Sequence, residues 1–411
     1  MRILHINYSD SKGGAATSVR RLQKSFLKNN YDSWLFVAHK FFLDKNVLTF
    51  DNTFDRINNH IKKIFSKIFC KFFKIFNYDL DYSISYFSSS TKKYINKIKP
   101  NIINLHWICN ETLSIEELPK INRPLVWTML DMWPFLGAQH IDLDQLTQKY
   151  WNDRNYKDNF FFDINTWVFK RKLNSFNFDF ELIAISNWLA NKAKESVLFK
   201  NKKISVIPCL LDFDQWLPLE KKEARKKLKL NIYLNKKFIL FSSAAGSSDK
   251  KKGFSYLVKI LKNCKNLKDF HLIIIGKLNI KDLEGLNISY SQFDNFLFGD
   301  PKVLSIIYSC ADLVIMPSII ESFGQVALEA AACNVPTLAF SNTGLEEIIK
   351  HKTNGYLANY LNFEDLTYGF HWSLNDENNK LLSSNCRIMA IKKFSDKLII
   401  SEYDNIYKKL I

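Results

Sequence analysis

Two glutamates that lie eight positions apart, Glu321 and Glu329, interrupt the otherwise apolar stretch IESFGQVALEAAACNVPTLAF at 320–340. The preceding run LVIM predicts a buried strand, after which the stretch predicts a loop and a helix from about 322–324 to 333. In a parallel sheet, ligands bind beyond the carboxyl ends of the strands and against helix N-termini. We therefore expect both carboxylates to accept hydrogen bonds from ligand hydroxyl groups, such as those of a ribose and of a sugar.

The predicted start of this helix also suits an anion. Backbone N–H groups of Ser322, Phe323 and Gly324 would point at a phosphate, helped by the helix dipole, and Gly324 lets a ligand approach the backbone. Each glutamate alone is explained as well by a charge at a helix N-terminus or by a solvated side chain. The pair with Ser-Phe-Gly after the first glutamate is the more specific pattern.

Short β-branched runs alternate with longer helical patterns along the chain, which predicts β-α-β units and mainly parallel sheets. Six such runs precede residue 208 and four follow it. We therefore expect an α/β protein with two doubly wound, Rossmann-like domains, at 1–208 and 209–390. The amphipathic pattern at 391–411 predicts a final helix that returns to the first domain.

The composition indicates a protein with two hydrophobic cores, no transmembrane helix and free thiols. A chain of 411 residues with 47% hydrophobic residues can fill two cores, and no run of about 18 apolar residues predicts a transmembrane helix. The N-terminal MRILHINYSDSKGG predicts a first strand and not a signal peptide. The seven cysteines form no Cys-x-x-Cys pair, which favours free thiols in a reducing cytoplasm.

Positive charge is concentrated in the first quarter of the chain. The net charge is +17, and residues 1–100 hold 18 Lys and Arg against 7 Asp and Glu. This imbalance predicts an anionic partner surface, and a general bias toward Lys, Asn, Ile and Phe is the alternative explanation. Because no nucleic-acid-binding motif accompanies the charge, we favour a membrane and exclude nucleic acid.

The segment IKKIFSKIFCKFFKIF at 61–76 has the spacing of an amphipathic helix. A basic helix rich in phenylalanine is typical of a helix that lies in the surface of an anionic membrane. The alternative is a helix that packs its apolar side on its own sheet and leaves the lysines in solvent. Both interpretations stay open. The lysines assigned to the membrane surface are Lys63, Lys67, Lys71 and Lys74.

The motif E-S-F-G-x(4)-E-A and the following CNVPTLAFSNTGLEEIIKHKTNGYLA resemble the donor-binding segment of the retaining glycosyltransferases of family 4. Members of that family have the GT-B fold, in which a cleft separates two Rossmann-like domains. The stretches ILHINYSDSKGGAATSVRRL, LVWTMLDMWPF and KKGFSYL are similar to the subset that builds capsule, colanic-acid-type and O-antigen polysaccharides.

This resemblance implies a hexosyl-type transferase that moves a sugar from a nucleotide-diphosphate donor, with retention of configuration, to a glycan acceptor on a lipid carrier. The acceptor would bind to the domain at 1–208 and the donor to the domain at 209–390. The implied location is the inner face of the bacterial cytoplasmic membrane, where the protein would be peripheral. No Asp-x-Asp motif in a suitable loop is evident, so we expect no metal and no other cofactor.

The resemblance also assigns roles to the residues of the opening motif. Glu321 would contact the transferred sugar, and Glu329 would accept hydrogen bonds from the ribose. The N–H groups of Phe323 and Gly324 would bind the diphosphate. Ser322 completes the same turn.

The resemblance further implies cations and bare backbone beside the diphosphate. Lys252 matches the family's lysine, whereas the family's arginine is missing, so Lys250 or Lys251 would have to replace it without the bidentate fork of a guanidinium group. On its own, the run DKKKG is also explained as a solvated turn. Gly13 and Gly14 would close over the donor phosphates.

The sequence departs from the family at Leu130, where relatives carry a histidine in WTLHDMWPF. Leucine neither donates a hydrogen bond nor relays a proton. The nearest residues to assume part of its role are Asp131, and His106 with Trp107 on the acceptor side. The open alternative for His106 is a buried core residue.

The second function that fits the sequence is a catalytically impaired GT-B scaffold that binds donor or glycan in an assembly complex.

Overall fold

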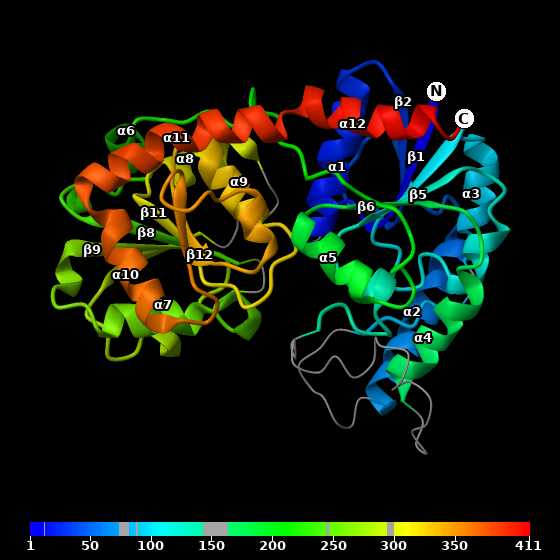
Figure 1. Ribbon diagram of the computed structural model, residues 1–411, viewed down its shortest axis with the longest axis horizontal. Helices are drawn as coiled ribbons and strands as arrows, with labels where there is room; N and C mark the ends of the chain where they lie inside the picture. The colour runs from blue at the N-terminus through cyan, green and yellow to red at the C-terminus, as the bar shows by residue number, and fades with distance from the viewer. Residues whose placement is uncertain (12, 74–81, 88, 143–162, 244–245, 294–299) are drawn as a thin grey trace. The chain divides into compact units, whose positions relative to one another are not determined.

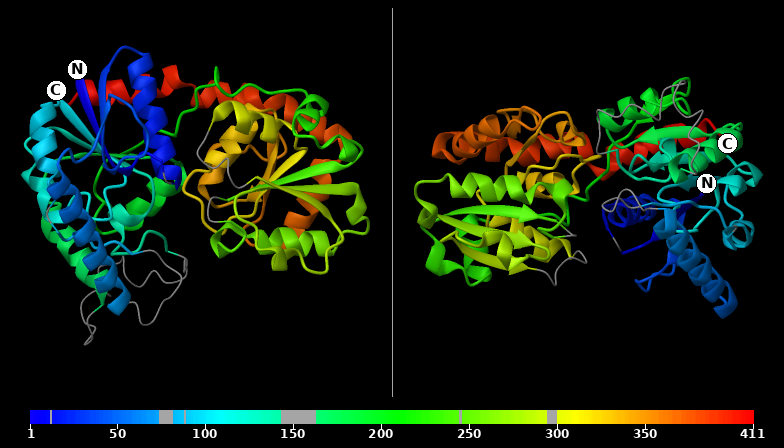
Figure 2. Two further views of the ribbon diagram at one scale, coloured as in Figure 1. Left: turned by 180° about the vertical axis from the view of Figure 1, so that it is seen from behind. Right: turned by 90° about the horizontal axis from the view of Figure 1, so that it is seen from below.

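The computed structural model describes residues 1–411 except 12, 74–81, 88, 143–162, 244–245 and 294–299 (Figure 1). Within the described part, the chain forms two compact units. The first contains Met1–Pro208 and Ile399–Ile411, and the second contains Cys209–Leu398. Helices cover both faces of the sheet in each unit (Figure 2).

The first unit is built on a parallel sheet of seven strands in the order β3-β2-β1-β4-β5-β6-β7. Its central strands are buried along their whole length, because helices shield both faces. The strands are β1 Arg2–Ser9, β2 Asp32–His39, β3 Val47–Leu48, β4 Ile102–Leu105, β5 Leu125–Met129, β6 Glu181–Ala184 and β7 Ile204–Val206. The helices are α1 Gly13–Lys28, α2 Thr53–Phe73, α3 Thr91–Ile98, α4 Ile164–Ser175 and α5 Asn187–Glu195.

The second unit has a parallel sheet of six strands in the order β10-β9-β8-β11-β12-β13. The strands are β8 Lys237–Ser242, β9 Phe270–Ile275, β10 Ser289–Phe293, β11 Leu313–Met316, β12 Thr337–Phe340 and β13 Gly355–Ala358. The helices are α6 Lys221–Lys227, α7 Phe254–Lys262, α8 Pro301–Ser309, α9 Gln325–Ala332, α10 Phe363–Leu374 and α11 Asp376–Phe394.

Both sheets confirm the predicted class of two doubly wound domains. The strand order reverses between β1 and β4 in the first sheet and between β8 and β11 in the second. Ligands of such sheets bind at this point of reversal, beyond the carboxyl ends of the strands. Three strands were not predicted, β3, β10 and β13, and all three are edge strands. They are too short or too polar to give an apolar run.

The C-terminal segment predicted as one helix at 391–411 consists of the end of α11 and a separate helix, α12 Asp396–Lys408. Residues from Ile399 onward belong to the first unit. The amide of Asn104 donates to the hydroxyl of Tyr407 at 2.7 Å, and the Tyr407 ring stacks on Phe26 with 5.7 Å between centroids. The tail therefore completes the core of a domain that begins with the first residues of the chain.

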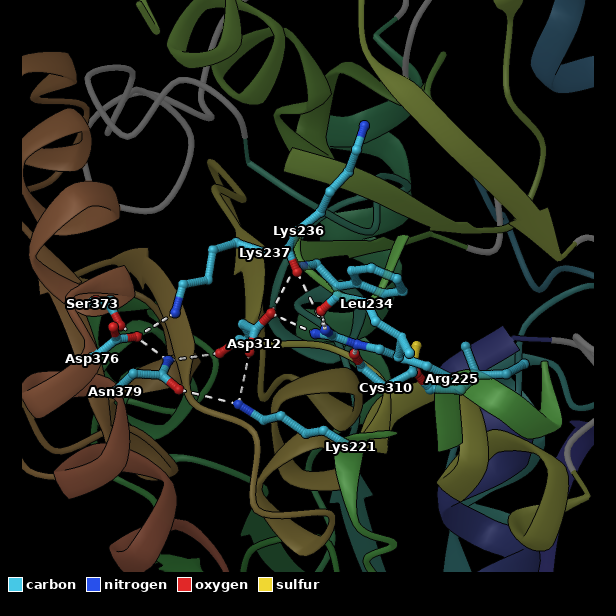
Figure 3. Close-up of polar contacts among 12 residues, drawn as sticks. Lys221, Arg225, Leu234, Lys236, Lys237, Cys310, Asp312, Ser373, Asp376 and Asn379 are labelled. Atoms are coloured by element: carbon cyan, nitrogen blue, oxygen red, sulfur yellow. Dashed lines mark hydrogen bonds and ion pairs between the residues drawn. The ribbon is translucent and has the colours of Figure 1, made fainter. Parts of the chain in front are cut away.

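A buried ion cluster anchors the start of β11 (Figure 3). Asp312 accepts hydrogen bonds from Nη2 of Arg225 at 2.7 Å, from Nζ of Lys221 at 2.9 Å and from the N–H of Phe238 at 2.7 Å. Burial acts to raise the pKa of Asp312, but the charges of Lys221 and Arg225 outweigh it and hold the pKa below its usual value. The cluster joins α6 to β8 and β11.

We predict that Arg225→Met lowers the free energy of unfolding by about 3–5 kcal/mol, because it removes the more deeply buried of the two cations that pair with the buried Asp312. Urea unfolding at neutral pH measures the loss. The pKa of Asp312 is lower in the folded chain, so its contribution is complete above about pH 4 and is lost as the pH falls below that.

The control is Lys237→Met, which removes an ion pair whose partner, Asp376, is 89% exposed. Exposed pairs of this kind contribute at most about 1 kcal/mol. Equal losses in the two variants would contradict the role given to the buried cluster.

Candidate functional site

An ion pair lies at the point of strand reversal in the second sheet. Lys252 follows β8, Glu321 follows β11, and Nζ of the lysine lies 2.6 Å from Oε2 of the glutamate. The Lys252 side chain is 32% exposed and that of Glu321 is 15% exposed. Burial acts to lower the pKa of Lys252, but the charges of Glu321 and Asp249 outweigh it and raise the pKa. Lys252 is therefore a cation at neutral pH.

Gly253 brings the two loops together. Its φ is +70°, and a Cβ at this position would lie 1.9 Å from the carbonyl oxygen of Pro317. The N–H of Ile319 donates to the carbonyl of Lys251 at 2.9 Å. Only glycine allows both the backbone conformation and this close contact, so it fixes Lys252 beside the loop that carries Glu321.

The loop after β12 holds the turn that precedes α9. The N–H of Gly344 donates to the carbonyl of Glu321 at 2.7 Å, and a Cβ on Gly344 would lie 2.2 Å from the carbonyl oxygen of Ser322. Gly324, with φ of +103°, is the residue before α9, and Phe323 is buried. The first N–H groups of any α-helix lack partners within the helix, so this end of α9 is suited to an anion.

Glu329 lies in the second turn of α9 and is only 7% exposed. Its Oε2 accepts a hydrogen bond from the hydroxyl of Tyr308 at 2.8 Å. Burial and the Glu329 charge raise the pKa of Tyr308 well above its usual value, so the phenol stays a donor. Tyr308 could not be predicted from the sequence, because one tyrosine in the apolar run PKVLSIIYS carries no sign of a partner on another helix.

The two glycines predicted to approach the donor open α1 in the first unit. Gly13 has φ of +81°, which favours glycine. Both Gly13 and Gly14 are exposed, and a Cβ on either would meet no atom within 4 Å. The backbone here is accessible to a ligand.

Asp131 is the centre of a polar network at the carboxyl end of β5. Its Oδ2 accepts from Nε1 of Trp107 at 2.7 Å and lies 2.7 Å from Nδ1 of His140. The other ring nitrogen of His140 is 2.9 Å from the hydroxyl of Ser83. The N–H of Trp133 donates to the second carboxylate oxygen at 3.1 Å. His140 could not be predicted from the sequence, because it lies in a loop nine residues after Asp131, where no periodicity marks it.

His106 is buried in the first unit, and Leu130 packs against apolar residues. His106 is 3% exposed, and its Nε2 lies 3.0 Å from Nδ1 of the buried His5. Burial holds the pKa of His106 well below its usual value. These contacts favour the core alternative for His106. Leu130 packs against a cluster of apolar residues, so a leucine has a structural role there. The cluster is Val19, Leu35, Val37 and Val47.

A buried lysine fixes the loop that follows Asp131. Lys172 of α4 is fully buried, and its Nζ donates to the carbonyl groups of Leu136 and Gly137, each at 2.9 Å, and to that of Trp133. Burial holds the pKa of Lys172 well below its usual value. This role could not be predicted from the sequence, because a lysine on a helix is usually solvated.

The helix predicted at 61–76 is the second half of α2, and Lys74 lies outside the described residues. Lys67 and Lys71 are exposed, whereas the ammonium group of Lys63 donates to the hydroxyl of Tyr8. The helix packs on its own unit through Asp55, Ser66 and Cys70. We call the residues on the other side, which are 44–76% exposed, the apolar face. They are Phe54, Ile57, Ile61, Ile64, Phe65, Ile68 and Phe72.

No group of three or more His, Cys, Asp and Glu is arranged to hold a metal ion in the part of the chain that the structure describes. No helix described by the structure is long and apolar enough to cross a membrane.

Two parallel, doubly wound sheets of this kind define the GT-B class of glycosyltransferase folds. Sucrose-phosphate synthase from Thermosynechococcus elongatus has this fold with a TM-score of 0.70 and 16% identity, over 100% of this chain and 99% of that chain. HepE from Anabaena in complex with UDP-glucose gives a TM-score of 0.65 and 16% identity over 100% of both chains.

Residues 221–390, in the second unit, match the family described as Glycosyl transferases group 1. An uncharacterized glycosyltransferase of Methanocaldococcus jannaschii is 31% identical over 204 residues, which are 48% of this chain and 51% of that protein. An uncharacterized protein in the cps region of Klebsiella pneumoniae is 31% identical over 241 residues, 55% of this chain and 61% of that one. The chain thus spans about half to three fifths of the length of these relatives.

A third relative is the capsular polysaccharide biosynthesis glycosyltransferase CapM of Staphylococcus aureus. It is 26% identical over 248 residues, which are 56% of this chain and 62% of CapM.

We predict that Gly253→Ala lowers the free energy of unfolding by at least about 1–2 kcal/mol, the cost of a left-handed backbone for alanine, because the new Cβ also meets the carbonyl of Pro317. Urea unfolding measures the change. The control is Gly14→Ala, where a Cβ meets open space. A Gly253→Ala protein as stable as the control would show that the contact does not fix the loop.

Proposed function

We propose that this protein is a retaining glycosyltransferase that moves a hexosyl group from a nucleotide-diphosphate sugar to a lipid-linked glycan of a bacterial surface polysaccharide. The observation that carries the proposal is the ion pair of Lys252 and Glu321 at the strand reversal, beside the N-terminus of α9. The family of residues 221–390 supports transfer of a sugar, and the UDP-glucose bound to HepE supports a nucleotide donor.

In this proposal the donor diphosphate binds between Lys252 and the first turn of α9. Negative charge grows on the diphosphate as the bond to the sugar breaks, and a cation already fixed in place stabilises that charge more than it stabilises the ground state. Lys251 of the same turn adds a second positive charge. No metal ion is required for this step.

The two glutamates position the donor. Glu321 holds Lys252 in place and offers its carboxylate to the hydroxyl groups of the transferred sugar. Glu329, oriented by Tyr308, accepts hydrogen bonds from the ribose hydroxyls. The backbone at Gly13 and Gly14 approaches the phosphates.

In the first unit, Asp131 and Trp107 are assigned to the sugar and acceptor side. Asp131 is held in one orientation by Trp107 and His140, so it can accept from a sugar hydroxyl without reorganising. We assign the acceptor proton to the departing phosphate, on the same face as the attack. This route retains the anomeric configuration and needs no imidazole at Leu130.

We predict that Lys252→Met lowers the rate of donor hydrolysis about 100-fold or more, the loss expected when one preorganised group leaves the transition state. The measurement is release of nucleotide diphosphate from a panel of nucleotide sugars. Lys262→Met, an exposed lysine at the end of α7, is the control. Nucleotide binding without turnover of any donor would contradict the catalytic proposal and support the alternative function, a catalytically impaired scaffold.

We also propose that α2 holds the protein on the anionic inner face of the cytoplasmic membrane. Seven large apolar side chains of the apolar face are exposed on one helix. Lys67 and Lys71 lie along the same helix and are exposed, so their charge complements anionic lipid. Burial of each Phe or Ile side chain among acyl chains contributes about 1.5–3 kcal/mol.

We predict that the double variant Phe65→Ser with Ile68→Ser binds vesicles of anionic lipid at least about tenfold more weakly, because two membrane contacts are lost. Liposome flotation measures the bound fraction. Leu381→Ser with Ile388→Ser on α11, side chains that are 52% and 68% exposed, is the matched control. Lys67→Glu with Lys71→Glu should weaken binding to anionic vesicles most at low salt. Unchanged flotation of both α2 variants would refute the membrane role.

A further inference from the structure

A pocket in the first unit has no part in the roles assigned so far. It lies at the carboxyl ends of β1 and β2, next to the first half of α2, and its volume is about 400 Å³, in the range of small-molecule sites. None of the described residues that line it is Asp or Glu. The lining includes five basic side chains and a tyrosine, namely Tyr8, His39, Lys40, Arg56, His60 and Lys63.

The three permanent cations of the pocket are bonded to neutral groups. Lys40 donates to two backbone carbonyls, Arg56 donates to one at 2.6 Å, and Lys63 donates to a phenol. The accepting residues are Asp44 and Val47 for Lys40, Phe50 for Arg56, and Tyr8 for Lys63. Among the residues that the structure describes, none of these three cations forms an ion pair with a carboxylate. Their charges are therefore not neutralised at the pocket.

Two carboxylates near the pocket's loop, Asp10 and Asp44, accept hydrogen bonds from backbone N–H groups. Asp10 is buried and accepts from the N–H of Phe41 at 2.8 Å and from that of Phe42 at 3.1 Å. It fixes the shape of the loop after β2. Three like charges around a cavity repel one another, and a phosphate removes this repulsion while it accepts hydrogen bonds from lysine and arginine.

The rim of the pocket is apolar. Phe41 and Leu43 both line it, and they are 57% and 103% exposed. On α2, the pocket residue His60 is followed by Ile61 and Ile64 of the apolar face, which are 45% and 44% exposed. A ligand that fits both regions has an anionic end and an apolar chain.

We propose that this pocket binds the phosphate group of a lipid phosphate, whose chain lies along the apolar face of α2. Lys63 then belongs to the phosphate site, and Lys67 and Lys71 belong to the membrane surface. This proposal rests on the membrane part of the proposed function. It adds a site for the charged end of the lipid that carries the acceptor.

Isothermal titration of the full-length protein with octyl phosphate, inorganic phosphate and octyl glucoside, all below the micelle concentration, tests the site. We expect octyl phosphate to bind at least about tenfold more tightly than octyl glucoside, because one charge-assisted hydrogen bond contributes about that much. Equal binding of inorganic phosphate and octyl phosphate would overturn the lipid part of the proposal, because the chain would then add nothing, and would identify a soluble phosphate as the ligand. Octyl phosphate that binds no better than octyl glucoside would overturn the proposal.

The variant Lys40→Met with Lys63→Met should weaken octyl phosphate binding about tenfold or more, whereas Lys67→Met with Lys71→Met, with the same change of charge, should not. Equal effects of the two pairs would overturn the site, because they would show a general effect of charge. A circular dichroism spectrum and urea unfolding verify that each variant is folded. The titrations contain no nucleotide sugar, so their outcome is separate from donor hydrolysis by the unaltered protein, which tests the proposed function.

Discussion

The contact of Gly253 with the carbonyl of Pro317 sets the geometry of the second unit's site. It brings the loop after β8 against the loop after β11, and the attraction between Lys252 and Glu321 acts only because the two backbones are already in place. Gly344 then adds the loop after β12 to the same cluster. Three loops far apart in the sequence thus converge at one end of the sheet, and the Asp312 cluster stabilises the start of β11 at the opposite end.

The pattern of the sequence is sufficient to predict the buried strands of both sheets and the loop that carries Glu321. Buried parallel strands are continuous apolar runs, and the loops between such runs mark the edge where ligands bind. Edge strands such as β10 alternate exposed and half-buried residues and carry no such run. Three residues act through contacts with other elements, namely Tyr308, His140 and Lys172. Neither their spacing nor their residue type therefore predicts these roles.

Helix α2 illustrates a different limit. Its periodicity predicts an amphipathic helix, but the same period fits a helix that packs its apolar side inward and one that presents it to a membrane. The structure shows that the apolar side is exposed and not packed inward, because Ser66 and Cys70 form the packed side while Phe65 and Ile68 are 59% exposed. The first unit also explains Leu130, which completes an apolar cluster in place of a polar group. Asp131 keeps a histidine partner all the same, since His140 reaches it from the following loop.

The return of the last residues to the first unit has a consequence for synthesis. Tyr407 stacks on Phe26 and bonds to Asn104, so the core of the first domain stays unfinished while the ribosome makes the second. Domains of most proteins fold in the order in which they emerge. Here the first domain acquires α12 only after the second domain has been made, so the apolar surface that α12 covers stays open until this helix emerges.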